Sequence, residues 1–322
     1  MNQEFCAQEP LVSIGVPVFN GARFIESAVR SALTQTYRNL EIIISDNAST
    51  DETGEICERL CELDPRIQYV RHARNLGAGK NFNEVLRRSR GQYFKWLAHD
   101  DLMSPNFVEA CVRELELDKG CVLAYPRTVI IDEVGTTIEE YGIKLRTDSG
   151  RQSTRFHDLA VAWSMCFEVF GLFRSDVLKK VGGMRNFSHG DGVLLARMGM
   201  VGPFKEVPSA IHKSRRHQTQ SMRMFGNEVS GGNDYHQYAV WFNPEARGRI
   251  AFPTWKIGRE LYRAIWSREV AAGERIKCHL TMVVWARKNI RHLACDLVVA
   301  SRQLQRRFVR RFGTASMVRT GA

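Results

Sequence analysis

The sequence predicts an α/β fold with three layers, in which helices cover both faces of a mainly parallel sheet, followed by a basic helical region. Two observations support this prediction. Near the start of the chain, short apolar segments alternate with helical patterns, as strand–helix–strand crossover units require. Beyond residue 250, the apolar segments become helical and rich in Lys and Arg. We expect a polar lead over residues 1–10, the α/β domain over 11–225 and the helical region over 226–322.

Four apolar runs that end in turn residues are expected to form parallel strands. The segments between them place apolar residues on one helical face, and residues 49–52 match a capping box at the start of one such helix. The expected strands are residues 11–19, 40–44, 67–70 and 93–97.

The later part of the domain gives weaker signals. Residues 121–131 form a fifth apolar run, and Pro126 within it predicts a strand at the edge of the sheet. Residues 136–158 are polar and aperiodic, which indicates a loop or mobile insert. The last strand and helices of the domain are expected at residues 170–174, 176–181 and 193–200.

Polar side chains follow three of the expected strands at their carboxyl ends. They are Asn20, Asp46 and the adjacent pair Asp100 and Asp101. Open α/β sheets bind ligands at this edge. Two neighbouring carboxylates repel each other unless a cation lies between them, and a divalent ion that holds substrate phosphates meets this need. In the sequence, no cap or core role explains Asp46.

A second interpretation of Asp100 and Asp101 is a solvated loop ahead of a helix. Ser104 suits the N-cap of that helix, and Pro105 suits its first position. This stretch alone leaves both interpretations open.

The composition is typical of a soluble globular protein in a reducing compartment. Hydrophobic residues make up 44% of the 322 residues and charged residues 25%. The eight cysteines lack the paired spacing of a zinc site, and no signal-peptide pattern precedes Leu11. We therefore expect reduced thiols and a cytoplasmic location.

The order and spacing of several motifs resemble glycosyltransferase family 2, whose members are inverting enzymes with the GT-A fold. The resemblance covers roughly residues 10 to 220. It is carried by residues 12–20, residues 46–51, Arg74-Asn75 with Gly77, Asp100-Asp101, residues 170–174, Gly182-Gly183 and Asp191.

The resemblance implies a binding site for a nucleotide-diphosphate sugar. Asp46 corresponds to the acid that contacts the nucleobase, usually uracil, and either Arg71 or Arg74 corresponds to the basic residue of the same pocket. Asp100 corresponds to the last acid of the Asp-x-Asp motif, whose first acid is Ala98 here. The residues expected to contact the donor are Pro17, Val18, Asn20, Asp46, Arg71, Arg74, Asn75, Gly77 and Asp100.

The resemblance also implies a metal cofactor and a catalytic base. Asp100, Asp101 and His217 would hold Mg²⁺ or Mn²⁺ together with the donor diphosphate. His217 follows Arg216 in an element typical of this region, although an exposed histidine in a basic loop is the alternative. Asp191 corresponds to the general base, which accepts the proton of the acceptor hydroxyl, although an acid just ahead of a helix is usually an N-cap.

Two further features bear on the reaction. Asn81 stands where family members usually carry a small residue, which predicts local repacking. The Gln-x-x-Arg-Trp element of processive members is absent, so synthesis of a long polymer is not expected. We expect transfer of a sugar to a hydroxyl of a glycan or a lipid-linked acceptor.

The positive charge is concentrated near the C-terminus. Residues 246–322 carry 17 Lys and Arg against four Asp and Glu, a net charge of +13, whereas the remainder carries −2 of the total of +11. A basic amphipathic helix over residues 303–311 suits an anionic membrane surface, and no run approaches the ~18 uncharged residues needed to span a bilayer. We expect peripheral attachment to the inner face of the cytoplasmic membrane, or a helix that packs on the α/β domain with its charges solvated.

Three other functions fit parts of the sequence. A sugar-phosphate nucleotidyltransferase needs a Gly-rich basic loop after the first strand, and residues 16–21 do not supply one. A nucleic-acid-binding protein would explain the basic tail, but aromatic residues do not alternate with the basic ones, so no nucleic-acid partner is expected. A glycosyltransferase-like binding module without activity is suggested by Ala98.

Overall fold

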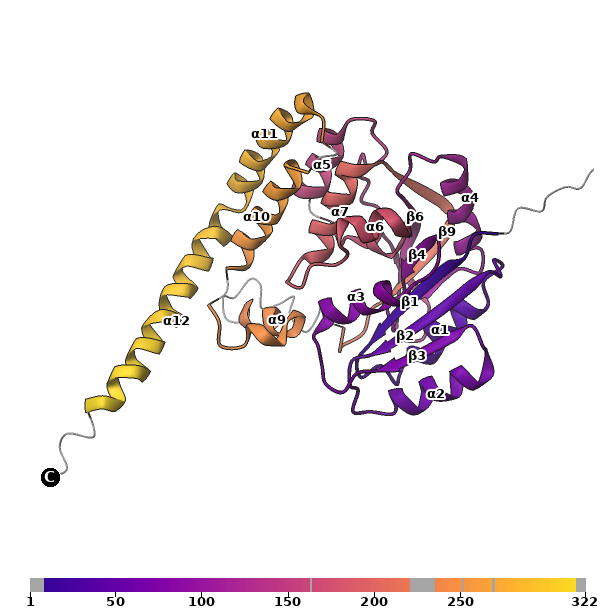
Figure 1. The fold of residues 1–322 in the computed structure, drawn as a ribbon, viewed down its shortest axis with the longest axis horizontal. Helices are drawn as coiled ribbons and strands as arrows, with labels where there is room; N and C mark the ends of the chain where they lie inside the picture. The colour runs from indigo at the N-terminus through magenta and orange to yellow at the C-terminus, as the bar shows by residue number, and fades with distance from the viewer. Residues whose placement is uncertain (1–8, 163, 221–234, 251, 268–269, 317–322) are drawn as a thin grey trace, which may run out of the picture.

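A computed structural model describes residues 9–162, 164–220, 235–250, 252–267 and 270–316, without the side chains of 235–238 and 306–316. An α/β body holds a mixed sheet, and helices near the C-terminus lie together beside it (Figure 1). The boundary expected near residue 225, the lead over residues 1–8 and the side chains from residue 306 of the expected basic helix lie outside the described part.

The first half of the sheet consists of four strands that are parallel, as the sequence predicts, and that lie in the order β3-β2-β1-β4. Every residue of β1 and β2 is buried, because helices cover both faces. Alternate residues of β2 join different cores: Ile42 and Ile44 pack with α1, α2 and α4, whereas Ile43 packs with α3 and α7. The strands are β1 (Val12–Val18), β2 (Leu40–Asp46), β3 (Ile67–Arg71) and β4 (Tyr93–Trp96), and the helices are α1 (Ile25–Leu33), α2 (Thr53–Leu63), α3 (Ala78–Arg88), α4 (Phe107–Leu117) and α7 (Gly190–Val201).

Beyond β4 the sheet becomes mixed. Its order continues β8-β6-β9-β5, with β8 antiparallel to both of its neighbours and β7 paired to β6. These strands are β5 (Leu102–Met103), β6 (Leu123–Ile131), β7 (Thr137–Glu140), β8 (Leu172–Arg174) and β9 (Phe204–Arg215).

The prediction that Pro126 marks an edge strand is wrong. β6 lies inside the sheet, between β8 and β9. Its pairing with β9 jumps from Val207 opposite Pro126 to Ile211 opposite Arg127. A proline lacks the N–H that a regular ladder needs, and this register shift is where the ladder is interrupted.

Two further expectations about local structure need correction. Residues 136–158 are not a loop throughout, because they contain β7 and the start of α5 (Gln152–Val161). The helix after Asp101 begins at Phe107 rather than at Pro105, with Asn106 as its N-cap. The Ser104 hydroxyl instead accepts a hydrogen bond from the Ile211 amide of β9. Pairing of β5 with β9 therefore replaces the expected helix start.

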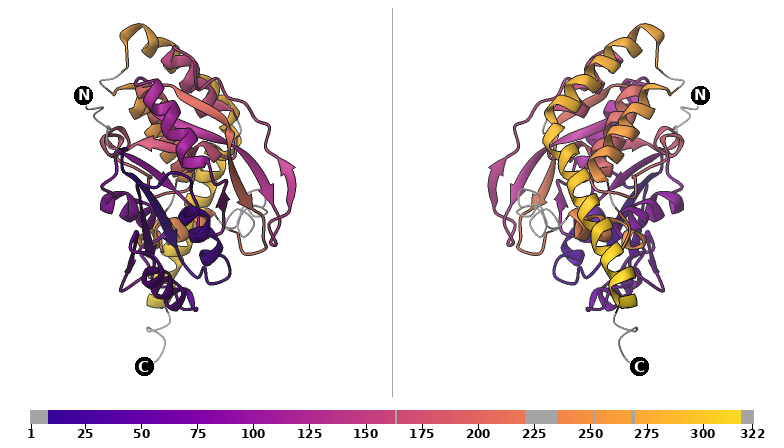
Figure 2. Two further views of the ribbon diagram at one scale, coloured as in Figure 1. Left: turned by 90° about the vertical axis from the view of Figure 1, so that its right-hand side faces the viewer. Right: turned by 90° about the vertical axis from the view of Figure 1, so that its left-hand side faces the viewer.

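In the described part of the chain, four α-helices follow the α/β domain, and the last three of them share a core with it. They are α9 (Tyr235–Phe242), α10 (Pro253–Ile265), α11 (Ala272–Lys288) and α12 (Ile290–Ser316). Leu261 of α10 and Trp285 of α11 belong to the same buried cluster as residues of α7. The right-hand view of Figure 2 shows α10, α11 and α12 across one side of the molecule. Among the described residues, none of the helices has the length and apolarity that a bilayer span requires.

Candidate active site

A hydrogen-bonded turn joins the carboxyl ends of β1 and β2. Pro17 and Val18 pair with the last two residues of β2. Asn20 has a left-handed backbone (φ +50°), its amide donates to Ser49 Oγ at 2.9 Å, and its Oδ1 accepts from the Thr50 amide at 2.8 Å. Three of the residues expected to contact the donor therefore lie at one edge of the sheet.

Asp46 has a structural role that the sequence did not reveal. The residue is fully buried, Oδ1 accepts from the Ser49 amide and Oδ2 from Tyr69 Oη, each at 2.8 Å. Burial and this hydrogen bond raise the pKa of Tyr69. The expectation that no core role explains Asp46 is corrected: its carboxylate holds the turn after β2.

The structure also separates the two arginines that the sequence left as alternatives. Arg71 Nε lies 3.7 Å from Asp46 Oδ2, and Arg71 Nη2 donates to the Ser49 carbonyl at 2.7 Å. Arg74 is exposed in the loop that follows β3. Arg71 is therefore the one that borders the turn formed by Asp46.

The loop between β3 and α3 is fastened to the same edge. Asn75 Oδ1 accepts from Asn47 Nδ2 at 3.0 Å and from the Gly77 amide at 2.8 Å. Gly77 has φ +86°, and an added Cβ would lie 2.4 Å from the Phe242 carbonyl of α9. A glycine is required here for both reasons.

Asn81 cross-links the two central strands at their ends. Its Nδ2 donates to the Ser45 carbonyl at 2.9 Å and to the Val18 carbonyl at 3.3 Å, and its Oδ1 accepts from Ser45 Oγ at 2.7 Å. The departure from the small residue of the family is thus matched by a polar partner on β2, and every polar atom of the buried amide group is used.

Asp100 and Asp101 have different surroundings. Asp100 Oδ2 lies 2.9 Å from His217 Nε2. Asp101 points into the protein, where Oδ1 accepts from the Arg215 amide at 2.8 Å and Oδ2 lies 3.2 Å from His212 Nε2. The two carboxylates therefore face different histidines.

The Asp100–His217 pair fits a divalent cation. Burial raises the pKa of Asp100, but the neighbouring His99 and His217 outweigh it and hold this pKa below its ordinary value. An ionised carboxylate beside an imidazole is a donor set suited to Mn²⁺ and acceptable to Mg²⁺. Asp101 is turned away from this pair towards β9, where Oδ1 accepts from the Arg215 amide and Oδ2 faces His212, so this arrangement does not support its expected role as a metal ligand.

Asp191 lies in the first turn of α7 rather than ahead of it. The N-cap position belongs to His189, which has φ +62° and makes no side-chain cap bond. Asp191 Oδ1 accepts from the adjacent Gly192 amide, and 38% of its side chain is exposed. The alternative of an N-cap is therefore not realised, and the carboxylate is accessible.

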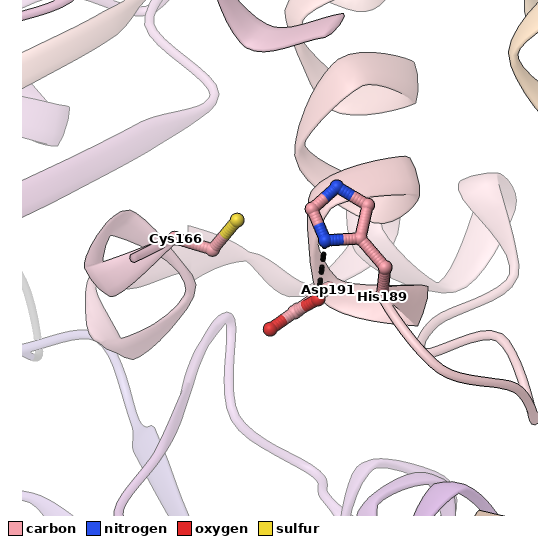
Figure 3. A group of neighbouring side chains, drawn as sticks. All are labelled: Cys166, His189 and Asp191. Atoms are coloured by element: carbon pink, nitrogen blue, oxygen red, sulfur yellow. Dashed lines mark ion pairs between the residues drawn. The ribbon is translucent and has the colours of Figure 1, made fainter. Parts of the chain in front are cut away.

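Two further side chains gather around Asp191 (Figure 3). One donor atom each of Cys166, His189 and Asp191 lies within 4.8 Å of the others, and His189 Nδ1 is 3.9 Å from Asp191 Oδ1. Burial and the Asp191 charge raise the pKa of the Cys166 thiol well above its ordinary value. A neutral thiol is a poor partner for Mg²⁺ or Mn²⁺, so this group is not the site of the expected cofactor.

The short helix η1 (Phe167–Phe170) connects this group with the Asp100 region. Cys166 is its N-cap residue, and the Phe170 ring stacks on His212 with centroids 4.9 Å apart. His212 in turn touches Asp101, the neighbour of Asp100. A chain of contacts through η1 and His212 therefore connects the Asp191 group with the loop that carries Asp100.

Sequence reasoning missed four residues of this site: Cys166, His189, His212 and Arg215. His212 and Arg215 lie on β9, whose sequence lacks the regular alternation of apolar and polar residues that predicts a strand. The left-handed backbones of Cys166 and His189 have no glycine or asparagine to mark them. The dipeptide Arg215-Arg216 ahead of His217 was the one available signal.

A family model described as "Glycosyl transferase family 2" matches residues 13–182, more than half of the chain. The chain belongs to glycosyltransferase family 2. The predicted membership is confirmed. This glycosyltransferase is 39% identical over 130 residues to an uncharacterized glycosyltransferase of Rickettsia felis, and 36% identical over 129 residues to chondroitin synthase of Escherichia coli.

Both alignments include 40% of this chain, but only 21% of the Rickettsia protein and 19% of the chondroitin synthase. The chain thus spans about a fifth of the length of these two relatives. The similarity concerns one shared module, and the activity of the whole relatives is a separate question.

Solved structures show the GT-A fold. A mannosyltransferase from Pyrobaculum calidifontis in complex with GDP-Man and Mn²⁺ matches with a TM-score of 0.55 and 16% identity over 97% of this chain and 81% of its own. TarS of S. aureus, residues 1–349 in complex with UDP, matches with a TM-score of 0.54 and 13% identity over 92% and 91%. The predicted fold class is confirmed.

Proposed function

We propose that this glycosyltransferase moves a sugar from a nucleotide-diphosphate donor, with UDP-sugars the first choice, to a hydroxyl of a glycan or lipid-linked acceptor. The transfer inverts the anomeric carbon and adds one sugar at a time. One observation carries the proposal: η1 links an accessible carboxylate, Asp191, to the buried Asp100–His217 pair. A site with one base on one side and a metal-binding pair on the other suits in-line displacement of a diphosphate.

The donor is held at the carboxyl ends of β1 to β4. Arg71 and the turn after β2, which Asp46 holds, border the nucleobase, and the loop with Asn75 and Gly77 closes over the nucleoside. Pro17, Val18 and Asn20 supply the floor, and Arg74 stands at the exposed rim. Support comes from the hydrogen bonds that bring these segments to one edge.

Asp100 and His217 would hold Mg²⁺ or Mn²⁺. Asp101 fixes the segment that carries Asp100 by its contacts with Arg215 and His212 of β9. When bound, the ion neutralises the charge that develops on the departing diphosphate. Asp191 accepts the proton of the acceptor hydroxyl as the new bond forms, which is typically worth about 10²–10⁴-fold in rate. A single base and attack from the face opposite the leaving group give inversion.

The test is release of nucleoside diphosphate from UDP-, GDP- and dTDP-sugars with Mn²⁺, in the presence and absence of candidate acceptors. We expect release with one nucleotide class, loss of release in EDTA, and a product of inverted anomeric configuration by NMR. Thermal stabilisation by a nucleotide sugar without release under any condition would instead identify a binding module.

The outer face of the C-terminal helices supports attachment to a membrane surface. Trp255 of α10 and Trp266, the C-cap residue of this helix, are 49% and 57% exposed, and Leu280, Ile290 and Leu297 of α11 and α12 are exposed as well. Basic residues lie on the same helices, and aromatic with cationic side chains favour the anionic headgroup region. The proposed location is the inner face of the cytoplasmic membrane, where a lipid-linked acceptor is presented.

A further inference from the structure

A cavity of about 500 Å³ lies between α10 and α7, and none of the residues proposed to contact the donor lines it. The loop before α7 and α7 itself contribute Arg185 and Arg197, and α10 contributes Lys256, Glu260 and Arg263. Four cationic side chains thus line a space that holds a single carboxylate.

Glu260 does not neutralise this cavity. It is 7% exposed, and its oxygens lie 2.9 Å from Arg263 Nη1, 3.4 Å from Arg259 Nη2 and 3.8 Å from Arg185 Nε. Lys256 Nζ instead stands 4.7 Å above the Phe187 ring. Burial, followed by repulsion from Arg259, lowers the pKa of Lys256. The ionisable groups that line the cavity therefore carry a net positive charge, which attracts an anion.

Two hydrogen-bond donors on the cavity wall lack acceptors. Arg185 Nε and Ser267 Oγ are buried and form no hydrogen bond, and both residues line the cavity. Buried donors are almost always paired in folded proteins. Guanidinium groups with a nearby hydroxyl form the donor set that binds phosphate oxygens.

The cavity wall is joined to the proposed base. The Arg185 carbonyl packs so closely on Gly190 that an added Cβ would lie 2.3 Å away, and Gly190 directly precedes Asp191. The wall of the cavity therefore lies against the residue that precedes the proposed base.

Helix α10 lies between the cavity and the exposed aromatic face, by which we mean Trp255 and Trp266. Lys256, Glu260 and Arg263 recur at helical spacing toward the cavity, whereas Trp255 and Trp266 are exposed. If these aromatic side chains insert into the headgroup region of a bilayer, the cavity on the same helix lies close to the headgroups. A phosphate carried on a lipid would be presented there.

We propose that this cavity binds the phosphate or diphosphate of a lipid-linked acceptor and so orients the acceptor sugar toward Asp191. The role in orientation rests on the proposed transfer reaction, whereas the anion site itself does not. The shared chemistry is a phosphate group held by Arg185, Arg197, Lys256 and Arg263.

The first experiment measures binding of inorganic pyrophosphate by calorimetry in EDTA, which removes any cation that would recruit pyrophosphate to the donor site. The double variant Lys256→Gln/Arg263→Gln should bind about tenfold more weakly or worse. Arg259→Gln is the matched control, because Arg259 is on the same helix and touches Glu260 but does not line the cavity. It should stay within about twofold of the parent.

Two outcomes of the binding experiment overturn the proposal. One is a parent protein that does not bind pyrophosphate in EDTA. The other is an equal loss in the double variant and in Arg259→Gln, which would indicate unspecific attraction by the basic helices. Melting temperatures of all variants within a few degrees of the parent show that the comparison concerns folded protein.

The second experiment compares an acceptor sugar attached through diphosphate to a short isoprenoid chain with the same sugar attached to a neutral alkyl chain. The double variant should raise KM for the diphosphate acceptor about tenfold and leave KM for the neutral acceptor and the donor unchanged. Equal KM values for both acceptors in the parent would refute the acceptor role. If no acceptor supports transfer, the proposed function fails, and the pyrophosphate titration still decides the anion site.

Discussion

At the scale of single residues, Asp191 is the most direct test of the proposed chemistry. Asp191→Asn keeps the size and polarity of the side chain but removes its basicity, so kcat should fall about 10²–10⁴-fold with donor KM little changed. Initial rates at saturating donor measure this. Asp176→Asn is the matched control, because Asp176 occupies the first turn of α6 (Ser175–Val181). An Asp191→Asn enzyme within threefold of the parent would contradict the assignment.

Lys95 gives a prediction about stability. Its side chain is completely buried in β4, with Nζ 4.1 Å from the Phe107 ring centroid and 3.6 Å from Met103 Sδ. In the described part of the chain, no carboxylate forms an ion pair with it. Desolvation lowers the pKa of Lys95 from 10.5 to about 7. Lys95→Met should therefore raise the free energy of unfolding at pH 7, on the order of a few kcal/mol.

The pH dependence of that effect has a defined sign. Above pH 7 the folded parent releases the proton that the unfolded chain keeps until pH 10.5, so its stability rises with pH across this interval. Lys95→Met should lose this rise, and below pH 7 its advantage over the parent should be constant. Urea denaturation at pH 6 to 10 measures both. Lys205→Met, on the exposed side of β9, should change neither.

His217 and Asp101 should respond to substitution in different ways. Loss of the imidazole beside Asp100 in His217→Ala should raise the Mn²⁺ concentration for half-maximal activity about 10–100-fold. Asp101→Asn keeps an acceptor for the Arg215 amide but loses the charge that faces His212, so the melting temperature should fall while the Mn²⁺ requirement stays near that of the parent. Activity measured against Mn²⁺ concentration for both variants tests this difference. The reverse pattern would identify Asp101, rather than His217, as a metal ligand.

At the scale of elements, the loop before α3 depends on Gly77. Gly77→Ala adds a Cβ at φ +86° and 2.4 Å from the Phe242 carbonyl, so it should strain the backbone and push α9 away from α3. We expect a loss of about 1–3 kcal/mol in unfolding free energy and a higher donor KM. Gly135→Ala is the control, because φ is +97° there and nothing lies within 4 Å of the added Cβ. Equal losses would mean that the contact with α9 is unimportant.

The elements that the sequence predicts well are those whose signals are local. β1 to β4 are compact apolar runs followed by turns, and their parallel order follows from the intervening helices. β9 escaped prediction because its apolar residues alternate irregularly and its partners, β5 and β6, are distant in the chain. Pro126 misled because only the pairing with β9 reveals where the ladder is interrupted.

The same distinction between local signals and contacts of distant segments applies to the residues of the candidate site. Asp46, Asp100 and Asp191 could be proposed from the sequence because each belongs to a short motif near a strand or helix end. Asp101 is oriented by its contacts with His212 and Arg215 of β9. These residues are distant from Asp101 in the sequence, so no local pattern predicts the contacts. The structural use of Asp46 likewise depends on Tyr69 from β3.

At the scale of the whole molecule, the exposed aromatic face predicts lipid binding. The protein should co-sediment with vesicles that contain anionic lipid and much less with neutral vesicles, and added salt should release it. The double variant Trp255→Ser/Trp266→Ser should bind several-fold more weakly, because two interfacial anchors are lost. Leu117→Ser is the control, because Leu117 is more exposed than either tryptophan but lies at the end of α4. Equal binding to neutral and anionic vesicles would contradict an electrostatic contribution.

The pairing of β5 with β9 also sets an order of events during synthesis. The four parallel strands that we propose to receive the nucleotide are complete once the first hundred or so residues have left the ribosome, whereas Asp100 meets His217 only after 117 further residues. At about 5–20 residues per second, that interval is roughly 6–23 s. During this interval the nascent chain has the proposed nucleotide-binding edge of the sheet but lacks His217. The proposed cation site therefore stays incomplete until the chain has been made as far as His217, which is after Asp191 has emerged.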